Sequence, residues 1–264
     1  MPAILAVKVD ELDRLVDSTT PSQALADELF AVVQLLEEKP TVRNALGDYS
    51  APEAARQQLA ATLFGAQLSA SALSIVKTAV AQRWEKPLQL LHSLDRLGIR
   101  VLELAAQAAG KLDAVEAELF AFRQVVTSSS GLRLALDDRT APVASRVQLV
   151  RELIVGKVDP LTQALAEHAV QGWRRTYEVR LEDALLIAAE IRSRKIAEVT
   201  VAKPLTAQQA ERLQATLTKQ IGEQVNLQIT VDPALIGGLR VRVGDDVIDG
   251  TVSGRLDAAR KELK

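Results

Sequence analysis

The sequence contains no cysteine, only two histidines and only 3% aromatic residues, and each shortage excludes a class of protein. Without cysteine, neither a disulfide-stabilised scaffold nor a cysteine-ligated metal site is possible. Histidine chemistry would have to rest on His92 or His168. Neither has a second histidine or a carboxylate at the i, i+4 spacing of a helical metal pair. We therefore expect both to be surface or half-buried structural residues.

An excess of positive charge and long apolar runs are also missing. The chain has 32 basic and 34 acidic side chains and a formal net charge of −2, so it has no positive excess with which to neutralise nucleic-acid phosphates. No export signal opens the sequence, and the longest uncharged window, 57–76, is interrupted throughout by glutamine, serine and threonine. We expect a cytoplasmic protein with no nucleic-acid partner and no membrane span.

Motifs for catalysis are absent as well. There is no phosphate-binding loop of the G-x-x-x-x-G-K-[ST] or G-x-G-x-x-G type and no G-x-S-x-G nucleophile elbow. Gly237 and Gly238 precede a predicted strand rather than a helix, which favours tight turns over phosphate binding. Asp245, Asp246 and Asp249 lack the ligand spacing of a calcium loop. We predict no catalytic, cofactor-binding or metal-binding residue, and a nucleotide-binding enzyme is an alternative that calorimetry with ATP would test.

What the sequence does contain is an apolar content of 48% made largely of helix-forming residues, and an internal repeat. Glu28-Leu29-Phe30-Ala31 recurs as Glu118-Leu119-Phe120-Ala121, at an offset of 90. Between positions 27 and 59 this offset gives 15 identities in 33 positions without a gap. Unrelated sequences of this composition would give roughly two or three. The repeat predicts a duplicated module of some 90 residues.

The predicted fold class is mostly α, with two related helical-bundle modules followed by a small α+β domain. Apolar residues at spacings of three and four predict helices over 24–36, 69–83, 88–109, 160–172 and 176–196. The cluster at 127–131 predicts a polar loop. After residue 196 the pattern changes to strands, with Val225, Leu227, Ile229 and Val231 alternating as one buried face. Thr206 and Gln209 form a capping-box signature for a helix between strands. We place the domains at 1–105, 106–196 and 197–264.

Two segments of the tail resemble the delta subunit of bacterial F-type ATP synthases, whose mitochondrial counterpart is the oligomycin-sensitivity-conferring protein. Residues 196–205 resemble the entry to the first strand in that family. The run 231–239, followed by 241–252, resembles its most characteristic motif, VDPALIGGL and VRVGDDVIDGTV. The helical module at 106–196 is similar in length and class to the family's N-terminal bundle. The additional first module resembles the longer actinobacterial-type form.

The resemblance implies a non-catalytic peripheral-stalk, or stator, subunit of a rotary proton-translocating ATP synthase. Its helical bundle would hold the N-terminal helices of alpha subunits on the catalytic head, and its C-terminal region would join the b-type stalk subunit. The protein would lie at the cytoplasmic face of the cell membrane as a peripheral protein, associated with the membrane only through the complex. Which of the two modules contacts the head stays open.

We expect the partner contacts to be apolar side chains on helical stripes and in the tail. The candidates for the helical modules are Leu29, Phe30, Val33, Leu119, Phe120 and Phe122. The candidates for the stalk contact are Leu235 and Ile236. The alternative is that the helical candidates are simply core residues, because a phenylalanine on a helical stripe is usually packed inside. A helical adaptor of another complex, with duplicated peptide-binding modules, is the alternative function.

Overall fold

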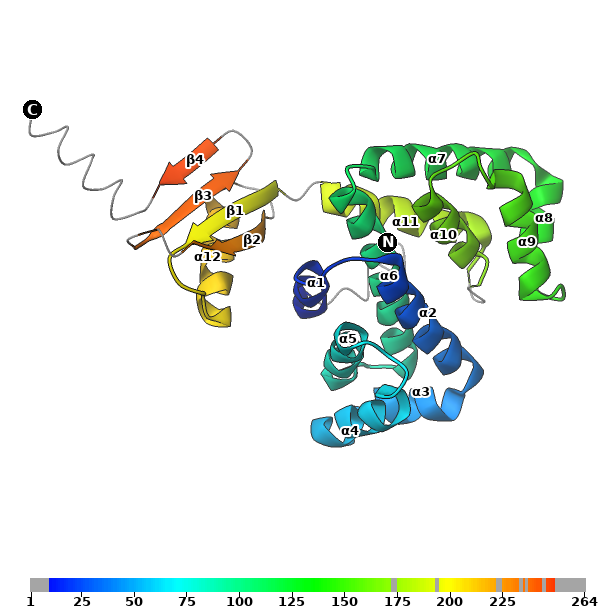
Figure 1. The fold of residues 1–264 in the computed structure, drawn as a ribbon. Helices are drawn as coiled ribbons and strands as arrows, with labels where there is room; N and C mark the ends of the chain where they lie inside the picture. The colour runs from blue at the N-terminus through cyan, green and yellow to red at the C-terminus, as the bar shows by residue number, and fades with distance from the viewer. Residues whose placement is uncertain are drawn as a thin grey trace, which may run out of the picture. The chain divides into compact units, whose positions relative to one another are not determined.

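A computed structural model describes residues 10–171, 175–192, 195–221, 225–232, 235, 237–243 and 246–249. The chain divides into two compact units, the first extending to Ala189 and the second beginning at Glu190. The first unit is helical, and the second combines a helix with a sheet (Figure 1). This confirms the predicted fold class of a mostly helical chain with a small α+β unit at the C-terminal end.

The helices of the first unit begin at the signals that the sequence provides. Ser22 accepts a hydrogen bond from the backbone N–H of Leu25, and Ser69 does the same for Ala72, both at 3.2 Å. A proline occupies the first turn of three helices, where its missing N–H costs nothing. The helices are α1 (Asp10–Asp17), α2 (Gln23–Glu38), α3 (Pro40–Gly47), α4 (Glu53–Phe64), α5 (Ala70–Ala81), α6 (Pro87–Ala108), α7 (Leu112–Ser128), α8 (Ser130–Asp137), α9 (Val143–Ile154), α10 (Pro160–Ala169) and α11 (Tyr177–Arg192).

Helix α6 is the element that both halves of the helical unit share. It contacts α1, α2, α3 and α5, which precede it, and α7 and α10, which follow it (Figure 1). Most of its side chains are buried, including two arginines that pair with carboxylates of α1. Arg96 lies 2.5 Å from Asp13, and Arg100 lies 2.7 Å from Asp17. These pairs hold α1 against α6 while neutralising charges that would be costly to bury alone.

Helix boundaries in this unit recur at the offset of the sequence repeat. Helices α3 to α6 begin at positions 40, 53, 70 and 87, and α8 to α11 begin at 130, 143, 160 and 177. A long-range contact recurs as well. Glu28 accepts a hydrogen bond from the backbone N–H of Ser69 at 3.1 Å, and Glu118 accepts one from Asp159 at 2.8 Å. The two halves therefore begin their helices in the same way and join them by the same kind of contact.

The loop predicted at 127–131 is much shorter in the structure. Helix α7 continues to Ser128 and α8 begins at Ser130, so only Ser129 lies between them. The Ser129 hydroxyl accepts a hydrogen bond from the backbone N–H of Leu132 at 3.3 Å and thereby caps α8. The run of serines marks a helix start rather than a loop, because serine favours the N-cap position as strongly as it favours turns.

The second unit is a sheet of the strands β1 (Lys195–Val201), β2 (Val225–Val231), β3 (Leu239–Val243) and β4 (Asp246–Asp249), with α12 (Ala207–Ile221) connecting the first two. The strand order is β2-β1-β3-β4; β1 and β2 are parallel, and the other two pairs are antiparallel. The predicted capping box is confirmed. The Thr206 backbone N–H donates to Gln209 at 2.9 Å, and the Thr206 hydroxyl accepts from the Gln209 N–H at 3.3 Å.

The alternation in β2 predicted one buried face, and half of that prediction is wrong. Val225 is buried and Leu227 packs against the core of the unit, which also contains Val199, Val201, Leu217 and Val241. Ile229 and Val231, in contrast, are 39% and 42% exposed. Strand β2 lies at the edge of the sheet, where period 2 determines which residues share a face but not whether another element covers that face.

Candidate functional site

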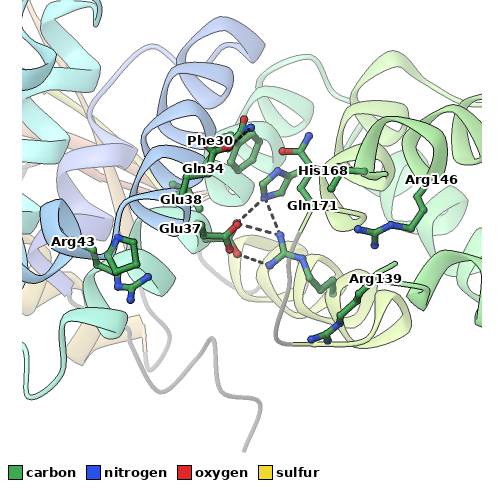
Figure 2. Close-up of a pocket in the computed structure, with 14 residues that line it drawn as sticks. Phe30, Gln34, Glu37, Glu38, Arg43, Arg139, Arg146, His168 and Gln171 are labelled. Atoms are coloured by element: carbon green, nitrogen blue, oxygen red, sulfur yellow. Dashed lines mark hydrogen bonds and ion pairs between the residues drawn. The ribbon is translucent and has the colours of Figure 1, made fainter. Parts of the chain in front are cut away.

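A pocket of about 550 Å³ lies within the helical unit, where α2 and α3 meet α9, α10 and α11. Phe30, Val33 and Glu37 line it from α2, and Arg43 lines it from α3. In Figure 2, Arg43 lies on one side of the pocket, and Arg139 and Arg146 lie on the other. We call it the junction pocket, because its walls come from both halves of the helical unit.

Three buried polar side chains, Asp95, His168 and Arg180, form a cluster among the residues that line the junction pocket, and Figure 2 labels His168 of this cluster. Asp95 of α6 accepts hydrogen bonds from the guanidinium of Arg180 of α11 at 2.7 and 3.1 Å. The Nε2 atom of His168 on α10 lies 2.7 Å from the same carboxylate. Burial opposes ionisation of Asp95, but the charges and hydrogen bonds of Arg180 and His168 outweigh it and hold the pKa of Asp95 well below its usual range. The cluster ties three helices together.

Burial lowers the pKa of His168 below its ordinary value, although the Asp95 carboxylate acts in the opposite direction. The imidazole is therefore neutral at physiological pH. Its Nδ1 atom is buried and makes no hydrogen bond within the described residues. Within the described residues the hydrogen-bonding partners of this histidine are Asp95 and Arg180.

An aromatic contact joins the two halves of the helical unit beside this cluster. The rings of Phe30 and His168 are stacked, with centroids 3.4 Å apart and planes 14° from parallel. Gly98 of α6 makes room for this contact, because a Cβ atom at that position would collide with the ring of Phe30. A helix-interior glycine costs about 1 kcal/mol relative to alanine. Here the close approach of Phe30 provides the reason for it.

The arginines around the junction pocket differ in their hydrogen-bonding partners. Arg43 donates to the backbone carbonyl of Leu36 at 3.2 Å, and Arg146 donates to those of Leu136 and Val170 at 3.1 and 3.2 Å. These bonds satisfy N–H groups but neutralise no charge. Arg139 is exposed and has no hydrogen-bonding or ion-pair partner in the described part of the chain.

Glu37 is the half-buried carboxyl group of this pocket. Burial raises its pKa to about 7, the negative charge of Asp95 adds to the increase, and Arg180 and Arg43 partly offset it. A large fraction of Glu37 is therefore neutral near pH 7. The net charge of the pocket lining is accordingly more positive than a count of its side chains suggests.

The sequence-predicted contact residues fall into different environments. Leu29, Val33, Leu119 and Phe122 are buried, as their core alternative requires. Phe30 and Val33 line the junction pocket, whereas Phe120 is 51% exposed on α7. Leu235 is half-buried in the second unit, and Ile236 lies outside the described residues. Sequence reasoning missed Glu37, Arg43 and Arg139, because no local motif connects side chains from separate helices.

The described residues contain no group of three or more histidine, aspartate or glutamate side chains placed to hold a metal ion. None of the described helices is long and apolar enough to cross a membrane.

The sequence matches the family model for the ATP synthase delta (OSCP) subunit over residues 101–263. The delta subunit of Parafrankia sp. is 45% identical over 240 residues, covering 90% of this chain and 86% of that protein. The delta subunit of Rhodococcus opacus is 42% identical over 248 residues, covering 94% and 89%. The chain belongs to the ATP synthase delta (OSCP) family. A chain of the mitochondrial ATP synthase hexamer of Toxoplasma gondii also matches, with 26% identity over 62% of this chain and 94% of that one and a TM-score of 0.27.

As a delta (OSCP) subunit, the protein is a non-catalytic component of the peripheral stalk of an F-type ATP synthase. This confirms the resemblance seen in the tail and the prediction of a stator subunit. The family model begins at residue 101, but the alignment with the Parafrankia protein covers 90% of the chain. That relative therefore shares most of the segment that precedes the family match.

Proposed function

We propose that the helical unit of this delta subunit holds the catalytic head by binding N-terminal helices of alpha subunits, and that its C-terminal unit joins the b-type stalk subunit. The protein then lies at the cytoplasmic face of the membrane, attached only through the complex. The observation that supports this proposal is the division into a helical and an α+β unit, each with its own core. A connector between two partners needs two separate binding surfaces of this kind.

Rigidity suits the stator role. Rotation of the central stalk would turn the catalytic head unless another protein held it, and the holding protein must transmit force without deforming. In the helical unit, α6 is buried along most of its length and contacts helices from both halves. Close packing of this kind transmits strain rather than absorbing it.

We also propose that the helical unit consists of two related modules that arose by duplication, the first predicted over 1–105 and the second over 106–196. The compact C-terminal unit begins at Glu190 and includes all of β1, so we place the end of the second module before that strand and not at residue 196. The recurrence of helix starts and of the Glu28 and Glu118 contacts at the offset of 90 supports this proposal. Helix α6 crosses the proposed boundary without a break, so the modules share a helix instead of being joined by a flexible linker.

For the head contact, the exposed candidate is Phe120 on α7. Burying a phenylalanine side chain contributes about 1.5–3 kcal/mol, which corresponds to roughly 10- to 100-fold in affinity. We expect Phe120→Asp to weaken binding to the purified catalytic head by that factor. The matched control is Val155→Asp, which places the same charge at another exposed apolar position of the helical unit, 55% exposed.

For the stalk contact, the exposed apolar face of the edge strand β2 supports binding of the b-type subunit by the C-terminal unit. Ile229 is 39% exposed there, and neighbouring residues of a strand point to opposite faces. Ile229→Glu should weaken binding to the b-type subunit at least tenfold, whereas Thr230→Glu, also exposed, should not. Failure of the wild-type chain to bind both the head and the b-type subunit in a clean reconstitution would overturn the proposed function.

Peptides distinguish this role from a general helical adaptor. Isolated N-terminal peptides of the alpha subunit should bind the wild-type chain, and titration calorimetry measures this directly. An adaptor of another complex would ignore those peptides.

A further inference from the structure

Three arginines of the junction pocket carry charges that this chain does not neutralise. Arg139 has no hydrogen-bonding or ion-pair partner in the described residues, and Arg43 and Arg146 donate only to backbone carbonyls there. The fourth arginine of the lining, Arg180, is paired with Asp95. An incoming anion would therefore find guanidinium groups that it can pair with without displacing a carboxylate.

The carboxyl groups of the lining do not cancel this positive charge. Four arginines line the pocket, against the carboxyl groups of Asp95, Glu37 and Glu38. The pKa of Glu37 is raised to about 7 by burial, so a large fraction of this group is neutral near pH 7. Glu38 is exposed and accepts a hydrogen bond from Gln34 at 3.0 Å. The lining is therefore net positive near neutral pH.

The internal repeat shows that Arg146 has a donor group that its structural role does not use. Its counterpart ninety positions earlier is Arg56, which donates to backbone carbonyls through both terminal nitrogens, Nη1 and Nη2. Arg146 donates to backbone carbonyls through Nη1 alone, and its Nη2 makes no hydrogen bond within the described residues. Because Arg146 lines the pocket, this nitrogen can serve an oxygen atom of a bound molecule.

The same pocket also offers apolar surface and the size of a small-molecule site. Phe30 and Val33 line it from α2, and Val143, at the first position of α9, is 44% exposed. The volume of about 550 Å³ lies within the range of about 300–1,000 Å³ that is usual for pockets that hold small ligands. Such pockets combine apolar walls with a few polar groups that orient the ligand.

We propose that the junction pocket binds a small organic phosphate, whose anionic group pairs with Arg139 and Arg146 and whose apolar or aromatic body lies against Phe30 and Val33. Arg139 and Arg146 lie on the same side of the pocket (Figure 2). A phosphate monoester suits two guanidinium groups, because it carries up to two negative charges and three acceptor oxygens. Inorganic phosphate would leave the apolar surface uncovered, and a neutral apolar molecule would leave the guanidinium groups unpaired.

A ligand in this position would join the two halves of the helical unit. Phe30 and Val33 belong to the first half, and Arg139 and Arg146 belong to the second. A molecule that binds only the folded arrangement stabilises it, in proportion to the logarithm of its concentration over its Kd. The site requires neither the catalytic head nor the stalk, so the purified full-length chain is sufficient to test it.

Phenyl phosphate is the probe, with inorganic phosphate and phenol as its two separate parts. We expect phenyl phosphate to raise the melting temperature of the wild-type chain and to bind with a Kd of about 1 mM or below in titration calorimetry. Inorganic phosphate and phenol should each bind at least roughly tenfold more weakly, because each matches only one of the two kinds of surface.

Substitutions at Arg139 and Val143 locate the site without disturbing the core. Arg139 is exposed, and Val143 lies in the first turn of α9, where an aspartate is favourable to the helix dipole. Arg139→Ala removes a guanidinium group, and Val143→Asp places a negative charge beside the phosphate. Each should weaken binding of phenyl phosphate roughly five- to tenfold, while the helical circular dichroism signal stays unchanged.

The matched controls are Arg133→Ala and Val155→Asp. Arg133 is an exposed arginine of α8 at the repeat position of Arg43, and Val155 is 55% exposed; neither is among the residues lining the pocket. Both control variants should bind phenyl phosphate as the wild-type chain does. The loss in Arg139→Ala should shrink at high ionic strength, because an exposed ion pair is screened by salt.

Glu37 provides an independent test through pH. The charged groups that face it are Asp95 of α6, Arg180 of α11, Arg43 of α3 and Glu38 of its own helix. His168 of α10 also lines the pocket and is held neutral by burial. As the pH rises from 6 to 8, Glu37 ionises and repels the phosphate. The affinity of Glu37→Gln relative to the wild-type chain should therefore be near one at pH 6 and rise severalfold by pH 8. Comparing the two chains at each pH cancels the ionisation of the phosphate itself.

Three results would each overturn the proposed site. Phenyl phosphate could fail to bind or to stabilise the wild-type chain. Inorganic phosphate could bind as tightly as phenyl phosphate, which would mean an adventitious ion only. Arg133→Ala could weaken binding as much as Arg139→Ala, which would mean attraction by general surface charge. None of these results touches the proposed function, because binding to the head and to the b-type subunit is measured separately.

Discussion

Glu103 on α6 is fully buried, and neither of its carboxyl oxygens has a hydrogen-bond partner in the described part of the chain. Burial raises its pKa to about 8, and the nearby negative charge of Glu116 adds to the increase. Ninety positions earlier, the buried Asp13 pairs with Arg96 at 2.5 Å. The position ninety after Arg96 is Leu186, so the second half of the helical unit lacks the corresponding arginine.

The magnitude follows from the difference in pKa between the unfolded and folded chains. In the unfolded chain Glu103 ionises at an ordinary pKa of 4.5, and in the folded chain at about 8. The stability that this group contributes is fully present below pH 4.5 and is lost as the pH rises to 8, because the unfolded state releases its proton first. At 1.36 kcal/mol per pKa unit, the loss amounts to roughly 4–5 kcal/mol.

The test is Glu103→Gln, which keeps the shape of the side chain and removes the ionisation. We expect the variant and the wild-type chain to have similar free energies of unfolding at pH 5. By pH 8 to 8.5 the variant should be more stable by several kcal/mol. Urea unfolding of the full chain, followed by the helical circular dichroism signal at intervals from pH 5 to pH 9, measures this difference.

The matched control is Glu152→Gln on α9, where the side chain is exposed and the substitution should change stability by less than about 0.5 kcal/mol at every pH. A difference between Glu103→Gln and the wild-type chain that stays constant with pH would refute the reasoning. It would mean that Glu103 is not held neutral by burial in the folded protein.

Further substitutions test a packing contact, a buried ion pair and a helix cap. Gly98→Ala should destabilise the helical unit by roughly 1–3 kcal/mol in thermal unfolding, because the new methyl group collides with Phe30. In a Phe30→Ala background the same change should be neutral or stabilising by up to about 1 kcal/mol, and persistence of the loss would contradict the steric explanation. Asp95→Asn should cost about 3–5 kcal/mol in urea unfolding, because it leaves the Arg180 guanidinium buried without its carboxylate; an unchanged midpoint would mean that the pair is not desolvated. Thr206→Ala should lower the stability of the C-terminal unit by about 1 kcal/mol through loss of its cap, which hydrogen exchange in α12 would detect.

The helical architecture was largely predictable because its signals are local. The helix predicted at 88–109 is α6 at Pro87–Ala108, and the capping box at Thr206 forms as expected. Such signals lie within one or two turns of chain, where periodicity and capping chemistry act directly. The boundary between loop and cap at Ser129 was not predictable, since the same residue types serve both.

The junction pocket was beyond sequence reasoning. Its lining extends from Phe30 to Arg180, and no spacing in the sequence relates residues that only the packing of α2, α3 and α9 to α11 brings together. The partly wrong prediction for β2 has a related cause. Alternation identified a common face for Ile229 and Val231, but coverage of that face depends on the rest of the fold.

The repeated tetrapeptide Glu-Leu-Phe-Ala separates what the sequence determined from what the tertiary structure decided. By itself the sequence determined that Leu29 and Leu119 lie on the apolar stripe of their helices, and the structure shows that both are fully buried. The environment of the next residue was decided by the tertiary structure, since Phe30 is 9% exposed and Phe120 is 51% exposed. The ring of His168 stacks on Phe30, and the lack of a side chain at Gly98 lets Phe30 pack closely against α6. Both residues are distant from Phe30 in the sequence. Identical local sequences fold into the same helix, but the neighbours that bury or expose a side chain are supplied by the rest of the chain.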